Sequence, residues 1–185
     1  MEQKSIFNTR LIHLLKIILF IGVFILAFWL SSRSQEYPFV IELVARFNYL
    51  AVFIIAVISG LNLFVPIPAV AFLPLFFEAG LNFWLVILTL TAGMFLADSF
   101  AFLLGKTGRH IVKMEKLKNE NKKLPYFFLF LFATFAPFPN EVLVIPMGLM
   151  GYKLKNMALP LAAGSFLFNF LYAYGVLNIF DIIIK

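Results

Sequence analysis

The sequence predicts an all-α integral membrane protein, in which a re-entrant hairpin and a transmembrane helix form an inverted repeat behind an N-terminal transmembrane anchor. Three observations predict this fold. First, 63% of the residues are hydrophobic and 13% charged, which leaves too little polar surface to enclose a water-soluble core. Second, Pro-x-Pro motifs interrupt apolar sequence at Pro66 and Pro68 and again, 71 residues later, at Pro137 and Pro139. Third, glycines and apolar residues after each motif keep the same spacing.

Residues 1–38 are predicted to form the anchor and a polar link. An apolar run at 17–30 follows Lys4, Arg10 and Lys16, a pattern that also suits the start of a signal peptide. No small-x-small cleavage site follows this run, so we expect a retained anchor with a cytoplasmic N-terminus, most simply in a bacterial cytoplasmic membrane.

Residues 39–185 are predicted to form the membrane domain, and its first repeat covers about 54–105. Proline at 66 and 68 removes two backbone donors and restricts the preceding residues, so a helix must break there. Inside a bilayer, a broken backbone is tolerated only where protein or a water-filled cavity receives it. We therefore expect a buried hairpin at this motif, followed by a crossing helix over 82–104.

The segment 39–63 has two interpretations. As the first arm of a hairpin, it places the N-terminus and the basic segment 106–123 on the inside and the C-terminus outside. As a complete crossing, it places the two basic clusters on opposite sides. The charge distribution favours the hairpin arm, while the lengths allow both.

A basic linker over 106–123 separates the repeats. It holds seven Lys or Arg against two Glu, and its apolar residues recur at near-helical spacing. An amphipathic helix on an anionic leaflet and a solvated loop are equally compatible with this pattern.

The second repeat covers about 125–176, with an incoming arm, the break at 137–139, a returning arm and a crossing over 155–175. A hairpin adds no net crossing and the following helix adds one, so the two repeats must be inverted. Their hairpins should enter from opposite faces and approach each other near the midplane.

In this order the motifs resemble the DedA superfamily, also called the VTT or SNARE-associated Golgi protein family. The resemblance covers about 39–175. It rests on the proline-rich first hairpin, a run from Gly93 through Asp98 to Arg109, and the segment 132–140 followed by Gly148 and Gly151. The resemblance implies a pair of facing re-entrant hairpins. It also implies movement of lipids between leaflets, such as undecaprenyl phosphate recycling in bacteria or phospholipid scrambling in eukaryotes. Several bacterial members of the family depend on the proton motive force.

The chain departs from the bacterial pattern as a divergent member. Typical members carry a carboxylate where this chain has Ala69 and Val70, and two arginines at the positions of Thr134 and Asn140. The hairpin-turn carboxylate is instead Glu141, in the second unit.

Four polar residues are candidates for a substrate pathway: Glu141, Asn140, Asp98 and Asn169. A carboxylate at membrane depth costs free energy unless it is paired or hydrated, so Glu141 suggests a functional role such as proton exchange. Capping of the returning helix explains Glu141 equally well. For Asn140 a head-group contact competes with a turn-forming role. For Asp98 and its repeat counterpart Asn169, a structural polar contact is the alternative.

The remaining candidates support the hairpins or attract a head group. Gly93 and Gly164 are expected to let the crossing helices approach the hairpins closely. The four prolines of the two motifs hold the breaks open. Lys106 and Arg109 could attract a phosphate head group, although a generic basic patch facing the membrane explains them too.

The leading hypothesis is a lipid translocase or scramblase, with membrane lipids and protons as partners and a homo-oligomer as its assembly. A proton-coupled exporter of small solutes and a non-transporting membrane organiser are the alternatives. No catalytic motif, metal-ligand cluster, cofactor motif or nucleic-acid motif occurs, so we expect no enzyme, no metal, no cofactor and no nucleic acid.

Overall fold

The computed structural model describes residues 38–61, 69–111, 124–136 and 139–183, together with positions 18, 22, 25 and 29. The predicted anchor therefore lies almost wholly outside the described residues. Pro66, Pro68, Pro137 and the linker residues 112–123 also lie outside them.

Every element of the described residues is a helix, which confirms the all-α prediction. Two helices, over Phe83–Arg109 and Leu154–Gly175, are long and apolar enough to cross a membrane. The elements are α2 (Pro38–Phe47), α3 (Tyr49–Gly60), η2 (Ala69–Phe72), α4 (Leu73–Glu78), α5 (Phe83–Ile111), α6 (Leu124–Phe135), α7 (Glu141–Leu149) and α8 (Leu154–Ile183).

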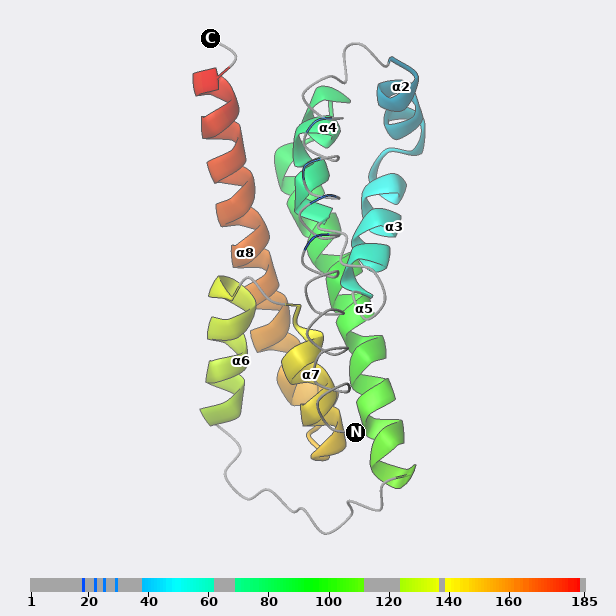
Figure 1. Ribbon diagram of the computed structural model, residues 1–185, viewed down its shortest axis with the longest axis vertical. Coiled ribbons are helices and arrows are strands. Elements are labelled where there is room, and N and C mark those ends of the chain that lie inside the picture. Colours follow the sequence, from blue (N-terminus) through cyan, green and yellow to red (C-terminus); the bar gives the residue numbers. More distant parts are fainter. Residues whose placement is uncertain are drawn as a thin grey trace, which may run out of the picture.

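The two long helices α5 and α8 run antiparallel, and a helical hairpin accompanies each of them (Figure 1). The first hairpin, α3 with η2 and α4, enters from the end of the bundle where α5 begins. The second hairpin, α6 with α7, enters from the opposite end, where α8 begins. The incoming helices α3 and α6 both end near the middle of the bundle, which is the inverted arrangement that the sequence predicts.

The repeat is visible in backbone detail at the turns that follow α4 and α7. Gly80 has φ 80° and Gly151 has φ 78°, a conformation that glycine adopts without strain. Leu81 N donates to Phe76 O over 3.2 Å, and the equivalent bond joins Tyr152 N to Met147 O over 3.1 Å. These bonds close the two helix ends in the same way. The next helices then begin 71 residues apart, at 83 and 154.

The segment 39–63 is not one straight crossing helix. The chain bends by 98° between Ile41–Phe47 and Tyr49–Gly60, at Asn48, which has φ 49°. The 12 residues of α3 are about 18 Å long, well short of a 30 Å hydrocarbon core. Since α3 runs only to the middle of the bundle and α4 lies back at the end where α3 begins, the geometry favours the hairpin-arm interpretation (Figure 1).

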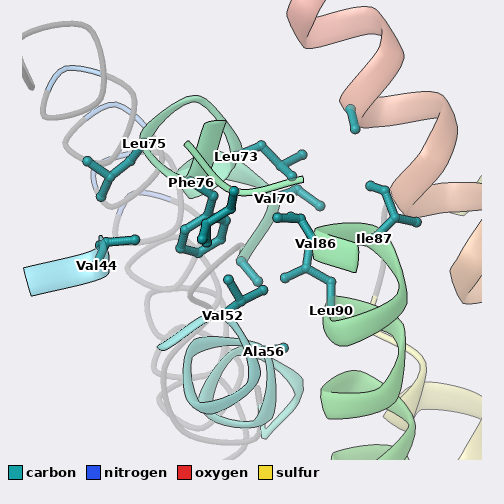
Figure 2. Packing of buried hydrophobic residues seen from close by; sticks show 13 residues of the cluster. Val44, Val52, Ala56, Val70, Leu73, Leu75, Phe76, Val86, Ile87 and Leu90 are labelled. Carbon is teal, nitrogen blue, oxygen red and sulfur yellow. The ribbon is translucent and has the colours of Figure 1, made fainter. Parts of the chain in front are cut away.

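Each hairpin has its own hydrophobic core. Around the first hairpin, buried side chains of α3, η2 and α4 converge on the first half of α5; Figure 2 shows Val52, Val70, Leu73, Phe76, Val86 and Leu90 among them. Around the second, side chains of α6 and α7 pack with the second half of α5 and the first half of α8: Ala101, Phe102, Leu129, Ala133, Val144, Met147, Met157 and Leu161. The middle of the bundle, between these cores, is where polar side chains gather.

Candidate functional site

All the buried polar side chains of the described residues except Ser59 belong to α5, α8 or the second hairpin. In a structure whose exterior exposes many large apolar residues, polar groups at depth are the exception that requires a physical reason. The buried polar residues are Ser59, Thr91, Asp98, Thr134, Glu141, Ser165 and Asn169.

Asp98 is the centre of the first polar group. It lies in the middle of α5 and is only 3% exposed. Asn140 Nδ2 donates to Asp98 Oδ2 over 2.9 Å and to Ser165 Oγ over 3.3 Å. One amide at the hairpin tip therefore joins α5 to α8, and we call Asp98, Asn140 and Ser165 the Asp98 station.

The side chain of Asn140 is committed to this contact rather than to its own helix. Asn140 occupies the N-cap position of α7 but makes no side-chain capping bond. Its backbone oxygen instead accepts from the N–H groups of Leu143 and Val144, over 3.0 and 2.9 Å. The amide is thus free of the capping role that an Asn at this position usually takes.

Glu141, the first residue of α7, is 5% exposed. The N-terminus of a helix stabilises a negative charge, so the capping interpretation and a role in the site agree in placing the carboxylate here. Together with Asp98, it gives the hairpin tip two buried carboxylates.

A second polar group lies further along the interface between α5 and α8. Asn169 is completely buried, and its Nδ2 donates to Thr91 Oγ1 over 3.2 Å and contacts Met94 Sδ at 3.6 Å. Thr91 in turn donates its hydroxyl to Ile87 O over 2.8 Å. We call Asn169, Thr91 and Met94 the Asn169 station. Asn169 and Met94 are the repeat counterparts of Asp98 and Ser165, each 71 residues apart.

The basic candidates lie at one end of α5, away from both stations. Lys106 and Arg109 follow Asp98 by 8 and 11 residues, about 12 and 16 Å along a helix axis. Arg109 packs over the turn after α7: a Cβ added to Gly151 would lie 2.6 Å from its Cζ. The structure therefore does not bring these two residues together with the polar candidates.

The two glycine candidates lie where the incoming arms cross the long helices. A Cβ added to Gly93 would lie 2.6 Å from Ala56 Cβ, and one added to Gly164 would lie 2.7 Å from Ala133 Cβ. Of the proline candidates, Pro139 lies in the described residues and its oxygen accepts from Val142 N over 3.2 Å.

Sequence reasoning missed the hydroxyl partners of the site. Ser165 lies four residues before Asn169 and Thr91 lies seven before Asp98, so each shares a helix face with a candidate that the sequence did single out. A polar residue four or seven positions from a candidate, on the same helix face, was the signal in the sequence that could have identified these partners. Thr134, one of the two positions where typical members carry arginine, donates its hydroxyl to Phe130 O over 2.8 Å within its own helix.

In the described part of the chain, no three His, Cys, Asp or Glu residues lie together in a way that could hold a metal ion. Among the described residues, the site presents amides, hydroxyls, a thioether and the carboxylates of Asp98 and Glu141. This arrangement can bind hydrogen-bond donors and positive charge.

Comparison with known proteins gives one match. The family model described as the VTT domain matches residues 65–177, which is more than half of the chain and spans both stations. No curated protein and no solved structure matches in the corresponding comparisons.

Proposed function

The chain belongs to the VTT-domain (DedA) family of membrane proteins, and we propose that it moves the head groups of membrane lipids from one leaflet to the other. The observation that carries this proposal is the amide of Asn140. It extends from a hairpin tip in the middle of the bundle to a buried carboxylate on one crossing helix and a hydroxyl on the other.

The exterior of the bundle suits the acyl chains of such a substrate. Large apolar side chains are exposed along α5 and α6, among them Leu88, Leu103, Leu104, Phe127 and Phe128. A lipid can therefore keep its chains in the bilayer while only its head group meets the polar stations between α5 and α8.

The hairpins lower the barrier that a head group has to cross. A charged group in the centre of a hydrocarbon core costs several kcal/mol or more unless polar partners receive it. Such partners lie at mid-bundle, where Asn140 and Glu141 at the tip of the second hairpin meet Asp98 of α5. This is the physical basis of the proposed activity.

The charge of the site favours a zwitterionic phospholipid over a polyprenyl phosphate. Two buried carboxylates, Glu141 at the tip and Asp98 on α5, belong to the site. The positions where typical members carry arginine hold Thr134 and Asn140. Without a cation at these positions, a strongly anionic head group lacks a counter-charge at the point of greatest depth.

Reconstitution tests the proposal. The purified protein is placed in liposomes with acyl-labelled fluorescent phospholipids, and the fraction bleached by dithionite reports movement between leaflets. Asp98→Asn and Asn140→Ala should slow this movement at least tenfold. Asn156→Ala is the matched control, because that exposed amide bonds only to Tyr126 Oη at the surface, over 3.3 Å.

The same assay separates the alternatives. Movement that stops when an imposed pH gradient is abolished would indicate proton coupling through Asp98 or Glu141. A wild-type protein that moves no labelled phospholipid and no polyprenyl phosphate above protein-free liposomes would contradict the proposal and leave the membrane-organising interpretation.

A further inference from the structure

One buried side-chain nitrogen or oxygen atom in the described residues has no hydrogen-bond partner: Oδ1 of Asn169. The residue is 0% exposed, so water does not reach this oxygen in the observed conformation. A buried carbonyl without a donor is costly, and native structures keep few of them.

The neighbours of Asn169 fix the orientation of its amide. The Thr91 hydroxyl uses its hydrogen on Ile87 O, so its oxygen is left to accept. Asn169 must therefore turn its nitrogen toward Thr91 and Met94, which leaves Oδ1 as the open acceptor. Rotating the amide would place two acceptors against each other and would gain no bond.

The position of the open acceptor relates it to the proposed lipid pathway. Asn169 occupies the place in the second repeat that Asp98 occupies in the first, and it lies one helical turn beyond Ser165 of the Asp98 station. The interface between α5 and α8 thus carries two stations related by the repeat. In the Asp98 station the amide of Asn140 donates to the carboxylate oxygen Oδ2. In the Asn169 station no donor in the described residues bonds to Oδ1.

We propose that Asn169 Oδ1 is a second binding station for the lipid head group, and that it selects a head group with N–H donors, namely the primary ammonium of an ethanolamine phospholipid. This inference rests on the proposed function. Because the oxygen is fully buried, the head group reaches it only when α5 and α8 separate.

The chemistry distinguishes between lipids that are otherwise alike. A primary ammonium donates to Oδ1, and the Asp98 carboxylate, one helical turn beyond Met94 on α5, attracts its positive charge. A choline head group carries the same charge but has no N–H, and a phosphate ester offers acceptors that meet another acceptor. Stepwise methylation of the ethanolamine nitrogen therefore removes the recognised donors without changing the net charge.

The experiment follows this methylation series in liposomes. Acyl-labelled phosphatidylethanolamine, its N-methyl and N,N-dimethyl forms and phosphatidylcholine are compared by dithionite bleaching. For the wild type we expect the rate to fall along the series, about tenfold from the first member to the last, the size of one hydrogen bond to a charged group. Asn169→Leu should remove the difference by lowering the ethanolamine rate, while Asn156→Leu should keep it.

The outcomes separate the inference from the function on which it rests. If the wild type moves all four lipids at one rate and Asn169→Leu does not alter that rate, the inference is overturned and the proposed function stands. If no lipid moves, both are overturned.

A binding measurement covers the case in which Asn169→Leu does not fold. Wild-type protein in detergent is unfolded thermally with added lyso-phosphatidylethanolamine or lyso-phosphatidylcholine. A higher midpoint with the ethanolamine lipid alone supports the station. Equal shifts, or none, contradict it.

Discussion

A single methyl group added to Gly164 should separate two helices that the repeat brings into close contact. In the structure, an ideal Cβ at Gly164 would lie 2.7 Å from Ala133 Cβ and 2.8 Å from Phe130 O, whereas ordinary contact begins near 3.4 Å. Neither obstacle can rotate away, because one is a Cβ and the other a backbone oxygen. Helix α6 must therefore move from α8 by about 0.6–0.7 Å.

The magnitude follows from two opposing terms. Overpacking of this kind costs about 1–3 kcal/mol, and the fixed obstacles place Gly164→Ala in the upper part of that range. Replacing a mid-helix glycine with alanine gains about 1 kcal/mol of helix propensity. The net expectation is a loss of about 1–2 kcal/mol in the free energy of unfolding.

Helix α8 supplies its own control. A Cβ added to Gly175 meets nothing within 4 Å, so Gly175→Ala should keep the propensity gain without the overpacking cost. Titration of each purified variant with sodium dodecyl sulfate, followed by far-ultraviolet circular dichroism, measures both free energies. The two variants should differ by about 2–3 kcal/mol. A Gly164→Ala variant as stable as Gly175→Ala would refute the close contact between α6 and α8.

Three further outcomes are expected. Gly151→Ala should destabilise the fold more than Gly80→Ala in the same titration. Both residues have positive φ, which costs about 1 kcal/mol for alanine. Only at position 151 does the new Cβ also meet a side chain, the guanidinium of Arg109. Asn140→Ala should lower the free energy of unfolding by about 1–3 kcal/mol and speed hydrogen exchange at the start of α7, because a buried carboxylate loses its amide donor; unchanged exchange there would contradict the contact. In this cysteine-free chain, an impermeant maleimide should label Asn82→Cys from outside and Lys153→Cys only after permeabilisation; labelling of both from one side would contradict the inverted repeat.

The fold was predictable because its signals are local. A Pro-x-Pro pair removes two backbone donors and favours a break, whereas the single prolines Pro146 and Pro160 lie inside α7 and α8. A glycine at positive φ closes a helix end, so the spacing of the proline pairs and these glycines revealed the repeat. The inverted arrangement then followed from counting crossings. What escaped was the bend at Asn48, because no proline or glycine marks it.

The register of the incoming arms also escaped prediction. Gly93 meets Phe53 O and Ala56, while Gly164 meets Phe130 O and Ala133, so the arms correspond at a spacing of 77 residues rather than 71. The first hairpin holds six more residues between its arm and its proline motif. Apolar sequence of this kind has no landmark that reveals such an insertion, and packing against the glycine decides the register.

The residues of the site could be predicted from the sequence, but the contacts between them could not. Asp98, Asn140, Glu141 and Asn169 stand out because polar groups are rare in apolar sequence. Which of them touch depends on how far the tip of the second hairpin reaches between α5 and α8, and sequence spacing says nothing about that distance.

The two halves of the repeat are unequal in how tightly they hold the long helices. In the second half, α7 lies against α5 at a glycine contact: a Cβ on Gly148 would lie 2.5 Å from Phe102 O and 2.9 Å from Lys106 N. The equivalent contact in the first half would join α4 to α8. There the repeat counterpart of Gly148 is Phe77, whose ring stacks on Phe83 at 5.7 Å.

This inequality indicates where the bundle can open. Aromatic rings fill the junction of α4, α5 and α8, with Trp84 stacked on Phe170 at 5.6 Å, and rings hold backbones further apart than glycines do. Within the first hairpin, Ser59 Oγ near the end of α3 accepts from Ala69 N at the start of η2 over 2.8 Å. The second hairpin packs against α5 through the backbone contacts of Gly148. We therefore expect α5 and α8 to separate first at the end occupied by the first hairpin, where Phe170, the residue after Asn169, belongs to the aromatic junction.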